Sequence, residues 1–389
     1  MDRASECERL SRPRFQIAST TMVVGLSIPS LLALLSLAPA IPVWAATYGC
    51  SDSIVGHQFL EKFTVQAIDD LTRGRVKYVD ATTAARLNLT YASDDHFIAR
   101  ADYTTVLDPK GPGRNSVRLH SNKQYGKGVM VYNINHLPEG CGTWPAVWSY
   151  AEIWPTKGEI DVVEGVNNQA YSQANLHTLP GCNMSEYRLM KGSTVATTCD
   201  YTVNYNAGCG VAYSNQHSFG PGFNDLGGGW FAVERTDKFI KTWFWSRDDP
   251  TVPWDVKTGA DQVFTDTWGI PEANFPDDMC DIRRLFGDHN IIINLTFCKN
   301  EVEHVLTHTY LSLLHFSSLP GGEWAGNAYT QSACPANPKY TNSTLACEDY
   351  VNNNPEAFEN AYFDFSWIKI YAPSSALDLD VNILQAYAT

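Results

Sequence analysis

The chain has 389 residues, and 44% of them are hydrophobic, which is enough to bury the core of one large domain or of two smaller ones. Its formal net charge is -14, and no basic run or stripe interrupts this acidic balance. The charge argues against binding to nucleic acid and to anionic membrane surfaces. Eleven tryptophans and 19 tyrosines suit a protein that stacks on the flat faces of sugars, although core packing uses such rings too.

Residues 1–46 have the pattern of a signal peptide with an extended N-terminus. Four arginines precede an uncharged stretch over residues 22–46, which contains the small-residue pattern V-W-A near its end. We expect cleavage before Ala46 or Thr47, which makes the protein secreted, extracellular or in the cell wall. An uncleaved signal anchor is the alternative, because about 20 apolar residues can span a bilayer. Three prolines interrupt the stretch and favour cleavage.

We interpret residues 47–373 as one domain and residues 374–389 as a C-terminal tail. Short runs with apolar residues at alternate positions dominate the domain, for example at 97–102, 128–135 and 239–246. Clusters of Gly and Pro separate these runs, and no long segment has helical periodicity. Many short strands between turns predict an all-β fold, either a β-sandwich or a jelly roll.

The cysteines also fit an exported protein. Cys7 lies upstream of the apolar stretch and should be lost with it. The other nine are scattered without a C-x-x-C pair, which favours disulfide bonds over a zinc site. Nine is an odd number, and we expect Cys50, close to the mature N-terminus, to be the unpaired one. Four N-x-S/T sequons fit a secreted glycoprotein, and they begin at Asn88, Asn183, Asn294 and Asn342.

Residues 299–320 do not fit the surrounding pattern. Their middle is apolar and uncharged, in a region where loops are polar. Two interpretations stay open, namely a genuine loop insertion at the active site and an unspliced intron translated in the gene model. A transcript that encodes the stretch would exclude the intron.

Residues 159–164, with the sequence E-I-D-V-V-E, place three acids among β-branched residues. Side chains alternate along a strand, so Glu159 and Asp161 share a face and Glu164 falls on the other one. A β-bulge at residues 162–163 would return Glu164 to the first face. Two glutamates close together can cleave a glycosidic bond with retention, one as nucleophile and one as acid and then base. An acidic strand edge and a calcium site are the alternatives for the bare pattern.

Tryptophans and glycines surround these acids in three blocks of sequence. They are G-C-G-T-W-P-A-V-W at 140–148, W-P-T-K-G-E-I-D-V-V-E-G-V-N at 154–167, and L-H-T at 176–178. The blocks resemble glycoside hydrolase family 16, and closely its fungal laminarinase-type branch. The resemblance covers residues 47–371 apart from the unusual stretch.

The resemblance implies a β-jelly-roll sandwich of two curved antiparallel sheets with an open concave cleft. It also implies a retaining endo-hydrolase of β-1,3 or mixed β-1,3(4)-glucans. We expect a β-glucan polysaccharide as the partner, no cofactor, no metal and a monomer. Two alternatives share the fold, namely a cell-wall transglycosylase with the same acids and a non-catalytic glucan-binding module, which would tend to lose them.

The resemblance assigns roles to individual residues. Glu159 matches the nucleophile, Asp161 the assisting acid and Glu164 the general acid/base. Four further residues match substrate-binding positions, and they are Trp148, Trp154, His177 and Trp324.

Other positions carry weaker expectations. We expect Trp144 to lie in the core rather than in the cleft. Arg235 and Phe363 stand where this branch usually places Trp. Arg235 should alter stacking at a distal subsite or lie on the surface, whereas a core should tolerate Phe363. Asn115 and Arg118 are left open between the cleft and the end of a strand.

Overall fold

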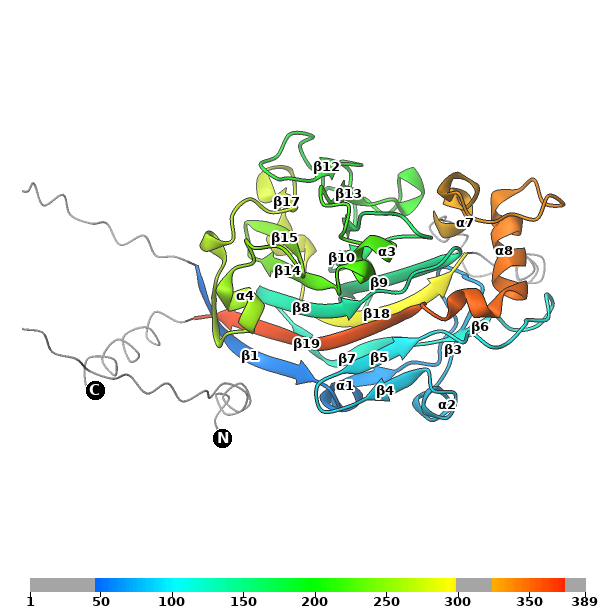
Figure 1. Cartoon of the computed structure of the whole chain (residues 1–389). Helices are drawn as coiled ribbons and strands as arrows, with labels where there is room; N and C mark the ends of the chain where they lie inside the picture. The colour runs from blue at the N-terminus through cyan, green and yellow to red at the C-terminus, as the bar shows by residue number, and fades with distance from the viewer. Residues whose placement is uncertain (1–45, 299–323, 375–389) are drawn as a thin grey trace, which may run out of the picture.

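The protein is built around two antiparallel sheets (Figure 1). The computed structural model describes residues 46–298 and 324–374. The predicted signal segment up to residue 45, the unusual stretch at 299–320 and the tail from residue 375 onward lie outside the described residues. The interpretations of these three segments therefore stay predictions.

The first sheet has nine strands, which are β1 (Thr47–Val55), β4 (Thr90–Ala92), β5 (Phe97–Arg100), β8 (Gly128–His136), β14 (Gly229–Arg235), β15 (Phe239–Ser246), β16 (Gln262–Phe264), β17 (Ala273–Pro276) and β19 (Tyr362–Pro373). Seven of them follow the order β16-β1-β19-β8-β14-β15-β17. Strand β5 pairs with β19, and β4 pairs with β5.

The second sheet has eight strands, which are β2 (Phe63–Val65), β7 (Arg118–Tyr125), β9 (Thr143–Tyr150), β10 (Glu159–Glu164), β11 (Gln173–His177), β12 (Ser193–Thr194), β13 (Cys209–Ala212) and β18 (His289–Phe297). Their order is β12-β13-β11-β10-β9-β18-β7-β2, which places β10 near the middle. A short parallel ladder joins β3 (Val76–Tyr78) to β6 (Arg114–Ser116).

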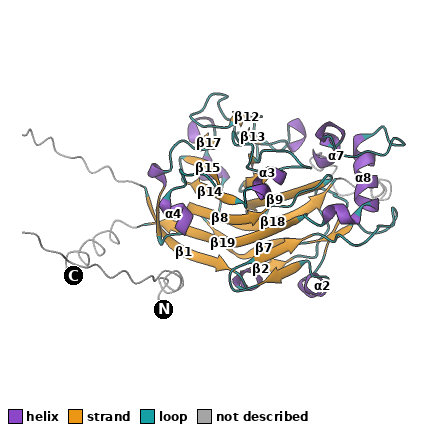
Figure 2. Cartoon of the chain, in the orientation of Figure 1, coloured by secondary structure: helices purple, strands orange, loops and turns teal. Residues whose placement is uncertain are grey.

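Helices are short and connect or flank the strands (Figure 2). The α-helices are α1 (Gln58–Lys62), α2 (Ala81–Arg86), α3 (Gly220–Asp225), α4 (Trp254–Thr258), α5 (Ile282–Leu285), α7 (Trp324–Ala328) and α8 (Ser343–Asn353). The 3-10 helices are η2 (Asn204–Asn206), η3 (Thr265–Thr267), η4 (Asp277–Met279), η6 (Thr330–Ser332) and η7 (Pro355–Phe358). No helix in this part of the chain has the length and apolar character that crossing a membrane requires.

The core follows from the alternation of side chains along the strands. Ile291, Ile293 and Leu295 of β18 and Phe363 and Phe365 of β19 are fully or almost fully buried in one apolar cluster that spans both sheets. Burying one such side chain stabilises the fold by about 1.5–3 kcal/mol. The predicted all-β sandwich is confirmed, and Phe363 lies in its core as expected.

Many of the tryptophans serve packing rather than sugar binding. A second apolar cluster, separate from the main core, contains Trp230, Trp243, Trp245 and Trp268. Trp268 meets Trp243 and Trp245 edge-to-face, at centroid distances of 5.3 and 5.7 Å. High aromatic content was therefore a weaker sign of sugar binding than the composition suggested.

Disulfide bonds connect the sheets and loops as the cysteine pattern predicted. Four pairs lie within the described residues, and they are Cys141–Cys334, Cys182–Cys280, Cys199–Cys209 and Cys298–Cys347. These four pairs use the other eight of the nine cysteines, so Cys50 is the odd one of the nine, as expected. Cys50 is itself disulfide-bonded, however, so the expectation that it is unpaired was wrong.

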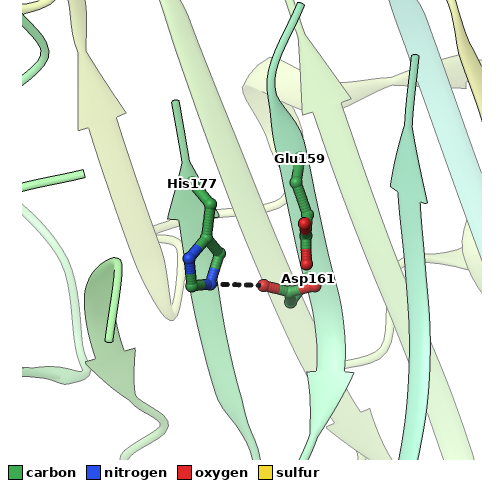
Figure 3. A group of neighbouring side chains, drawn as sticks. All are labelled: Glu159, Asp161 and His177. Carbon is green, nitrogen blue, oxygen red and sulfur yellow. Dashed lines mark ion pairs between the residues drawn. The ribbon is translucent and has the colours of Figure 1, made fainter. Parts of the chain in front are cut away.

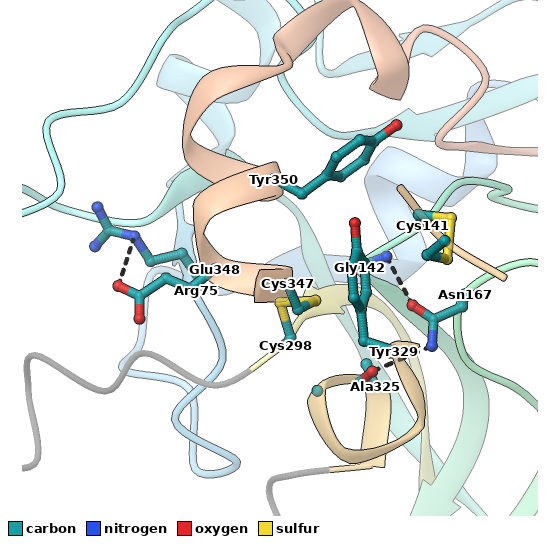
Figure 4. The surroundings of a disulfide bond; sticks show 12 residues. Arg75, Cys141, Gly142, Asn167, Cys298, Ala325, Tyr329, Cys347, Glu348 and Tyr350 are labelled. Atoms are coloured by element: carbon teal, nitrogen blue, oxygen red, sulfur yellow. Dashed lines mark hydrogen bonds and ion pairs between the residues drawn. A yellow bond between two sulfur atoms is a disulfide. The ribbon is translucent and has the colours of Figure 1, made fainter. Parts of the chain in front are cut away.

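Two of these disulfides hold α8 and the segment just after α7 and η6 at the end of the sandwich (Figure 4). Asn167, three residues after β10, strengthens the same junction. Its Oδ1 accepts a hydrogen bond from the Gly142 amide at 2.8 Å, and its Nδ2 donates to the Ala325 carbonyl at 3.1 Å. The exit of β10 is thereby tied to α7, the helix that begins with Trp324.

One of the four sequons is incompatible with a glycan. Asn294 lies in the middle of β18 and is only 7% exposed. Its Oδ1 accepts from Trp148 Nε1 at 2.6 Å, and its Nδ2 donates to the Tyr78 hydroxyl at 3.0 Å. Glycosylation at Asn294 would break both contacts, which corrects the expectation for this sequon. The other three asparagines are exposed.

Candidate active site

A β-bulge shapes the strand that carries the three acids. The pairing with β9 skips Val162, because the register shifts between Asp161 and Val163. The pairing with β11 shifts over the same interval, between Asp161 and Glu164. This is the predicted bulge, and it returns Glu164 to the face that carries Glu159 and Asp161. We call these three residues the acidic triplet, and the side of the eight-stranded sheet that carries them the acidic face.

Strand pairing brings distant parts of the sequence onto the acidic face. Glu159 lies directly opposite His177 of β11. Asp161 lies between Trp148 of β9 and Asn175 of β11. Ile160, Val162 and Val163 point the other way, into the main core. Alternation along the strand, together with the bulge, thus separates the reactive groups from the apolar groups of one strand.

A residue of the preceding loop holds the Glu159 side chain in place. Trp154 Nε1 donates a hydrogen bond to Glu159 Oε2. The Trp154 ring in turn meets Tyr201 edge-to-face, with centroids 5.4 Å apart. These contacts restrict the rotamers of Glu159 and fix the direction of its second oxygen. The predicted proximity of Trp154 to the acids is present in the structure.

Glu164 accepts hydrogen bonds on both carboxylate oxygens. Trp144 Nε1 donates to Oε1 at 2.9 Å, and Asn175 Nδ2 donates to Oε2 at 2.6 Å. Burial raises the pKa of Glu164, and the charge of Glu159 raises it further, while the two hydrogen bonds lower it. The balance is upward, which favours a protonated carboxyl group. Trp144 is buried as expected, yet it also orients an acid, which the sequence did not reveal.

Asp161 and His177 form a buried pair beside Glu159 (Figure 3). His177 Nε2 lies 3.4 Å from Asp161 Oδ2. Burial and the charges of Glu159 and Glu164 raise the pKa of Asp161 well above its usual range. Burial by itself lowers the pKa of His177, but the Glu159 and Asp161 carboxylates outweigh it and raise that pKa to about 10. A cationic imidazole therefore offsets part of the negative charge of the acidic triplet.

The same groups have the spacing of a possible cation site. Glu159, Asp161 and His177 offer ligand atoms that lie within 4.8 Å of one another. An ion bound there would compete with the Trp154–Glu159 hydrogen bond and the His177–Asp161 ion pair. A protonated imidazole has no lone pair to offer a metal, so the raised pKa of His177 acts against metal binding near neutral pH.

Trp148 and Trp324 flank the acids from different elements. Trp148 stacks on Tyr150 at 5.1 Å between centroids, and the Arg118 guanidinium lies over the Trp148 ring at 5.0 Å. This places Arg118 on the acidic face and answers the question that the sequence left open for it. Trp324 lies edge-on to Trp144 at 6.0 Å, on the side of Glu164.

Arg235 has neither of the roles expected for it. Its side chain is 8% exposed, and its guanidinium donates to the Gly287 carbonyl and lies 6.0 Å from the centroid of the Phe286 ring. Phe286 in turn packs against Gly158, where an added Cβ would lie 2.4 Å from the ring. Arg235 thus supports the turn that leads into Glu159. Arg235 also lines a cavity of about 170 Å³, and no residue of the acidic triplet lines this cavity.

Three asparagines of the site were not predicted. Asn175 bonds Glu164, Asn206 bonds His177, and Asn294 bonds Trp148. Asn175 stands two residues before His177, so strand alternation alone could have placed it on the same face. Asn206 lies in a loop and carries no sequence signal of this kind.

The fold consists of two antiparallel sheets, and its bulged central strand presents two glutamates and an aspartate beside aromatic side chains. These features define a class of jelly-roll glycoside hydrolases. Within this class the chain belongs to glycoside hydrolase family 16. A family model described as "XgeA-like, catalytic GH16 domain" matches residues 63–319 and 312–371. The resemblance found in the motifs, the jelly-roll fold and the assignment as a glycoside hydrolase are therefore confirmed.

Curated fungal proteins are similar to the chain over most of its length. It is 35% identical over 331 residues to the "Probable glycosidase C21B10.07" of Schizosaccharomyces pombe, covering 84% of this chain and 70% of that protein. It is 33% identical to "Endo-1,3(4)-beta-glucanase xgeA" of Emericella nidulans, covering 88% of this chain and 50% of that protein. The chain thus spans about half the length of several curated relatives it matches.

Solved structures of the family are similar as well. The "GH16 Laminarinase 16A from Phanerochaete chrysosporium", solved with β-glucans in donor and acceptor sites, shares 46% sequence identity with a TM-score of 0.75. The comparison covers 84% of this chain and all of that one. An elongating β-1,3-glucosyltransferase of the same family shares 32% identity with a TM-score of 0.72, again over 84% of this chain and all of the other.

Replacing Asn175 with alanine should raise the pKa of Glu164 further, because the hydrogen bond from Asn175 stabilises the charged carboxylate. The alkaline limb of kcat/KM reports the essential acid of the free enzyme, so we expect this limb to move to higher pH. The maximum of kcat/KM should fall by no more than about tenfold, the effect of one hydrogen bond.

Gln173→Ala is the matched control for this pH profile. Gln173 lies on β11, the strand that also carries Asn175, and is directly opposite Glu164. Both described hydrogen bonds to the Glu164 carboxylate nevertheless come from other residues. An unshifted alkaline limb in Asn175→Ala, or an equal shift in the control, would contradict the assignment of Glu164 as the acid.

Proposed function

We propose that this protein is a secreted enzyme that hydrolyses internal β-1,3 or mixed β-1,3(4) linkages of glucans with retention of configuration. The observation that carries the proposal is the bulged strand β10, which presents Glu159 and Glu164 on one face with an indole N–H on each. The printed activities of the fungal glucanases and the bound glucans of the laminarinase support the choice of substrate. The disulfide bonds fit an oxidising compartment.

In this proposal Glu159 attacks the anomeric carbon and Glu164 protonates the leaving oxygen. Each oxygen of Glu164 accepts one of the two donors and keeps a second lone pair that can carry the proton. Formation of the glycosyl-enzyme removes the charge of Glu159, which is one cause of the raised pKa of Glu164. That pKa then falls, and Glu164 becomes a base able to activate water.

We further propose one catalytic domain over residues 47–373, active as a monomer. Trp148, Trp154, His177 and Trp324 are the proposed contacts to the glucan, since all four lie around the acidic triplet. In the proposed mechanism one carboxylate is the nucleophile and the other is the acid and then the base, which gives retention of configuration. An inverting enzyme would instead use its second carboxylate only as a base that activates water.

A transglycosylase is the second candidate, favoured by the similarity to the elongating β-1,3-glucosyltransferase. It would use the same acids and pass the glycosyl group to another glucan instead of to water. The outcome depends on how well an acceptor sugar competes with water for the glycosyl-enzyme.

Product analysis with laminarin, lichenan and cellulose tests both candidates. We expect reducing ends to accumulate on laminarin or lichenan but not on cellulose, and the first products to have the β configuration by proton NMR. Oligomers longer than the substrate would identify a transferase. Binding without turnover would overturn both candidates and indicate a glucan-binding module.

A further inference from the structure

The imidazole of His177 is held on both of its nitrogens. Nε2 faces Asp161 of the acidic triplet, 3.4 Å from Oδ2. On the opposite side, Nδ1 lies 2.9 Å from the side-chain oxygen Oδ1 of Asn206. An amide oxygen only accepts hydrogen bonds, so this contact requires a proton on Nδ1. The requirement holds for the neutral ring and for the cation.

Asn206 ends η2, a single turn within the loop between Cys199 and Cys209, and the backbone of this turn adopts an unusual conformation. Asn204, Tyr205 and Asn206 have φ values of 50, 55 and 57°, three consecutive residues in the left-handed region that side chains disfavour. Such backbone persists only where the surrounding structure imposes it, and it gathers at functional sites. Here the disulfide Cys199–Cys209 closes the loop at its base. Backbone hydrogen bonds inside the loop, such as Asn206 N to the Val203 carbonyl at 3.0 Å, hold the turn.

The same loop also contacts the ring face. Gly208 has a φ of 68°, and an added Cβ would lie 2.8 Å from both Cε1 and Nε2 of His177. Only a glycine lets the backbone approach the imidazole this closely. The ring is therefore enclosed by Gly208, by Asn206 at Nδ1 and by Asp161 at Nε2, and it is 8% exposed.

We propose that Asn206 is a positioning residue of the active site, which keeps a proton on Nδ1 of His177 so that only Nε2 exchanges a proton with the acidic triplet. The inference rests on the proposed function, in which that triplet does the chemistry. A ring free to flip would present either nitrogen to Asp161, and a ring free to change tautomer could lose its proton from either nitrogen. With Nδ1 committed to Asn206, Nε2 always meets Asp161 in one geometry, as for histidines that a second group orients.

The charges around the ring link the hydrogen bond at Nδ1 to the pKa of His177. Glu159 and Asp161 face the imidazole from β10, and Glu164 interacts with it at longer range. The hydrogen bond from Nδ1 to Asn206 helps these carboxylates raise the pKa of His177. Loss of Asn206 should therefore lower that pKa and weaken the cation that offsets the acidic triplet.

Asn206→Gly tests the proposal, because glycine removes the side chain yet adopts the left-handed backbone without strain. We expect kcat/KM on laminarin to fall about tenfold, the effect of losing a hydrogen bond to a charged group, with KM little changed. We also expect the pKa of His177, followed by nitrogen-15 NMR of the ring, to fall. The neutral ring should then populate the tautomer with a bare Nδ1.

Two further variants separate positioning from stability. Asn204→Gly makes the same change in the same left-handed turn, at an exposed residue, and should leave kcat/KM and the His177 signals unchanged. Asn206→Asp keeps an acceptor at Nδ1, so it should restore the protonated Nδ1 and raise the pKa of His177. A bare Nδ1 in the unaltered protein, unchanged His177 signals in Asn206→Gly, or an equal loss in Asn204→Gly would overturn the proposal.

The NMR readout separates this inference from the proposed function. If the protein cleaves no glucan, the ring signals of the three variants still decide whether Asn206 fixes the tautomer. If the protein cleaves laminarin while Asn206→Gly keeps the same tautomer and pKa, the positioning role fails and the proposed function stands.

Discussion

Glu159→Ala should abolish glucan cleavage and leave glucan binding intact. The substitution removes the carboxylate that would form the covalent intermediate, so no glycosyl-enzyme can accumulate. We expect kcat to fall on the order of 10⁴-fold or more, about 5.4 kcal/mol of transition-state stabilisation, as for other enzymes that lose a nucleophile. Binding should persist, because the aromatic side chains around the site are unchanged. Kinetics on laminarin, with binding measured by calorimetry, provide the test.

The structure adds a second readout to this experiment. Glu159 is among the causes that raise the pKa values of Asp161, Glu164 and His177, so its removal should lower all three. Glu152→Ala is the matched control, since Glu152 is an exposed glutamate in the preceding loop. Wild-type activity in Glu159→Ala, or equal losses in Glu152→Ala, would contradict the role of Glu159.

Glu164→Gln should lose activity in proportion to how much the leaving group needs a proton. On laminarin, whose leaving group is a sugar alkoxide, we expect kcat/KM to fall by about 10²–10⁴-fold, the usual contribution of general acid catalysis. An aryl β-glucoside oligomer with a low-pKa phenol leaves without protonation, so its glycosylation step should be largely spared. Burst kinetics on the aryl substrate separate that step from the slower hydrolysis of the glycosyl-enzyme, which needs the base.

Glutamine would also disturb the hydrogen bonds at this position. Both oxygens of Glu164 accept N–H donors, from Trp144 and Asn175, and glutamine has only one oxygen. One donor would then meet an amide NH₂, which adds a local structural cost to the chemical one. Glu164→Ala avoids that clash and should show the same dependence on the leaving group. Equal losses for good and poor leaving groups in both variants would exclude Glu164 as the acid.

The sequence placed the acids well because their arrangement is a local property. Alternation along one strand fixes which residues share a face, and a single extra residue reverses it, whatever else the chain does. The bulge at Val162 and the common face of Glu159, Asp161 and Glu164 could therefore be deduced from six residues. Trp154 is five residues from Glu159, and its proximity followed from the same short stretch.

Predictions failed where they depended on which distant segments meet. The sequon at Asn294 matched a glycosylation pattern, but pairing of β18 beside β9 buries this asparagine between Trp148 and Tyr78. Arg235 looked like a change at a subsite or on the surface, and it instead contacts Gly287 and Phe286 behind the turn before Glu159. Neither partner is near in sequence, so no local rule could have named it.

The sequence by itself thus determined the acidic triplet, its shared face and the all-β class, because strand periodicity and turn chemistry act over a few residues. The tertiary structure decided the state of those acids. Asn175 and Trp144 on Glu164, and Asn206 on His177, come from β11, β9 and a disulfide-closed loop that meet β10 only after the sheet has formed. Hydrogen bonds, burial and charge set each pKa, and these depend on the distances between segments rather than on their order.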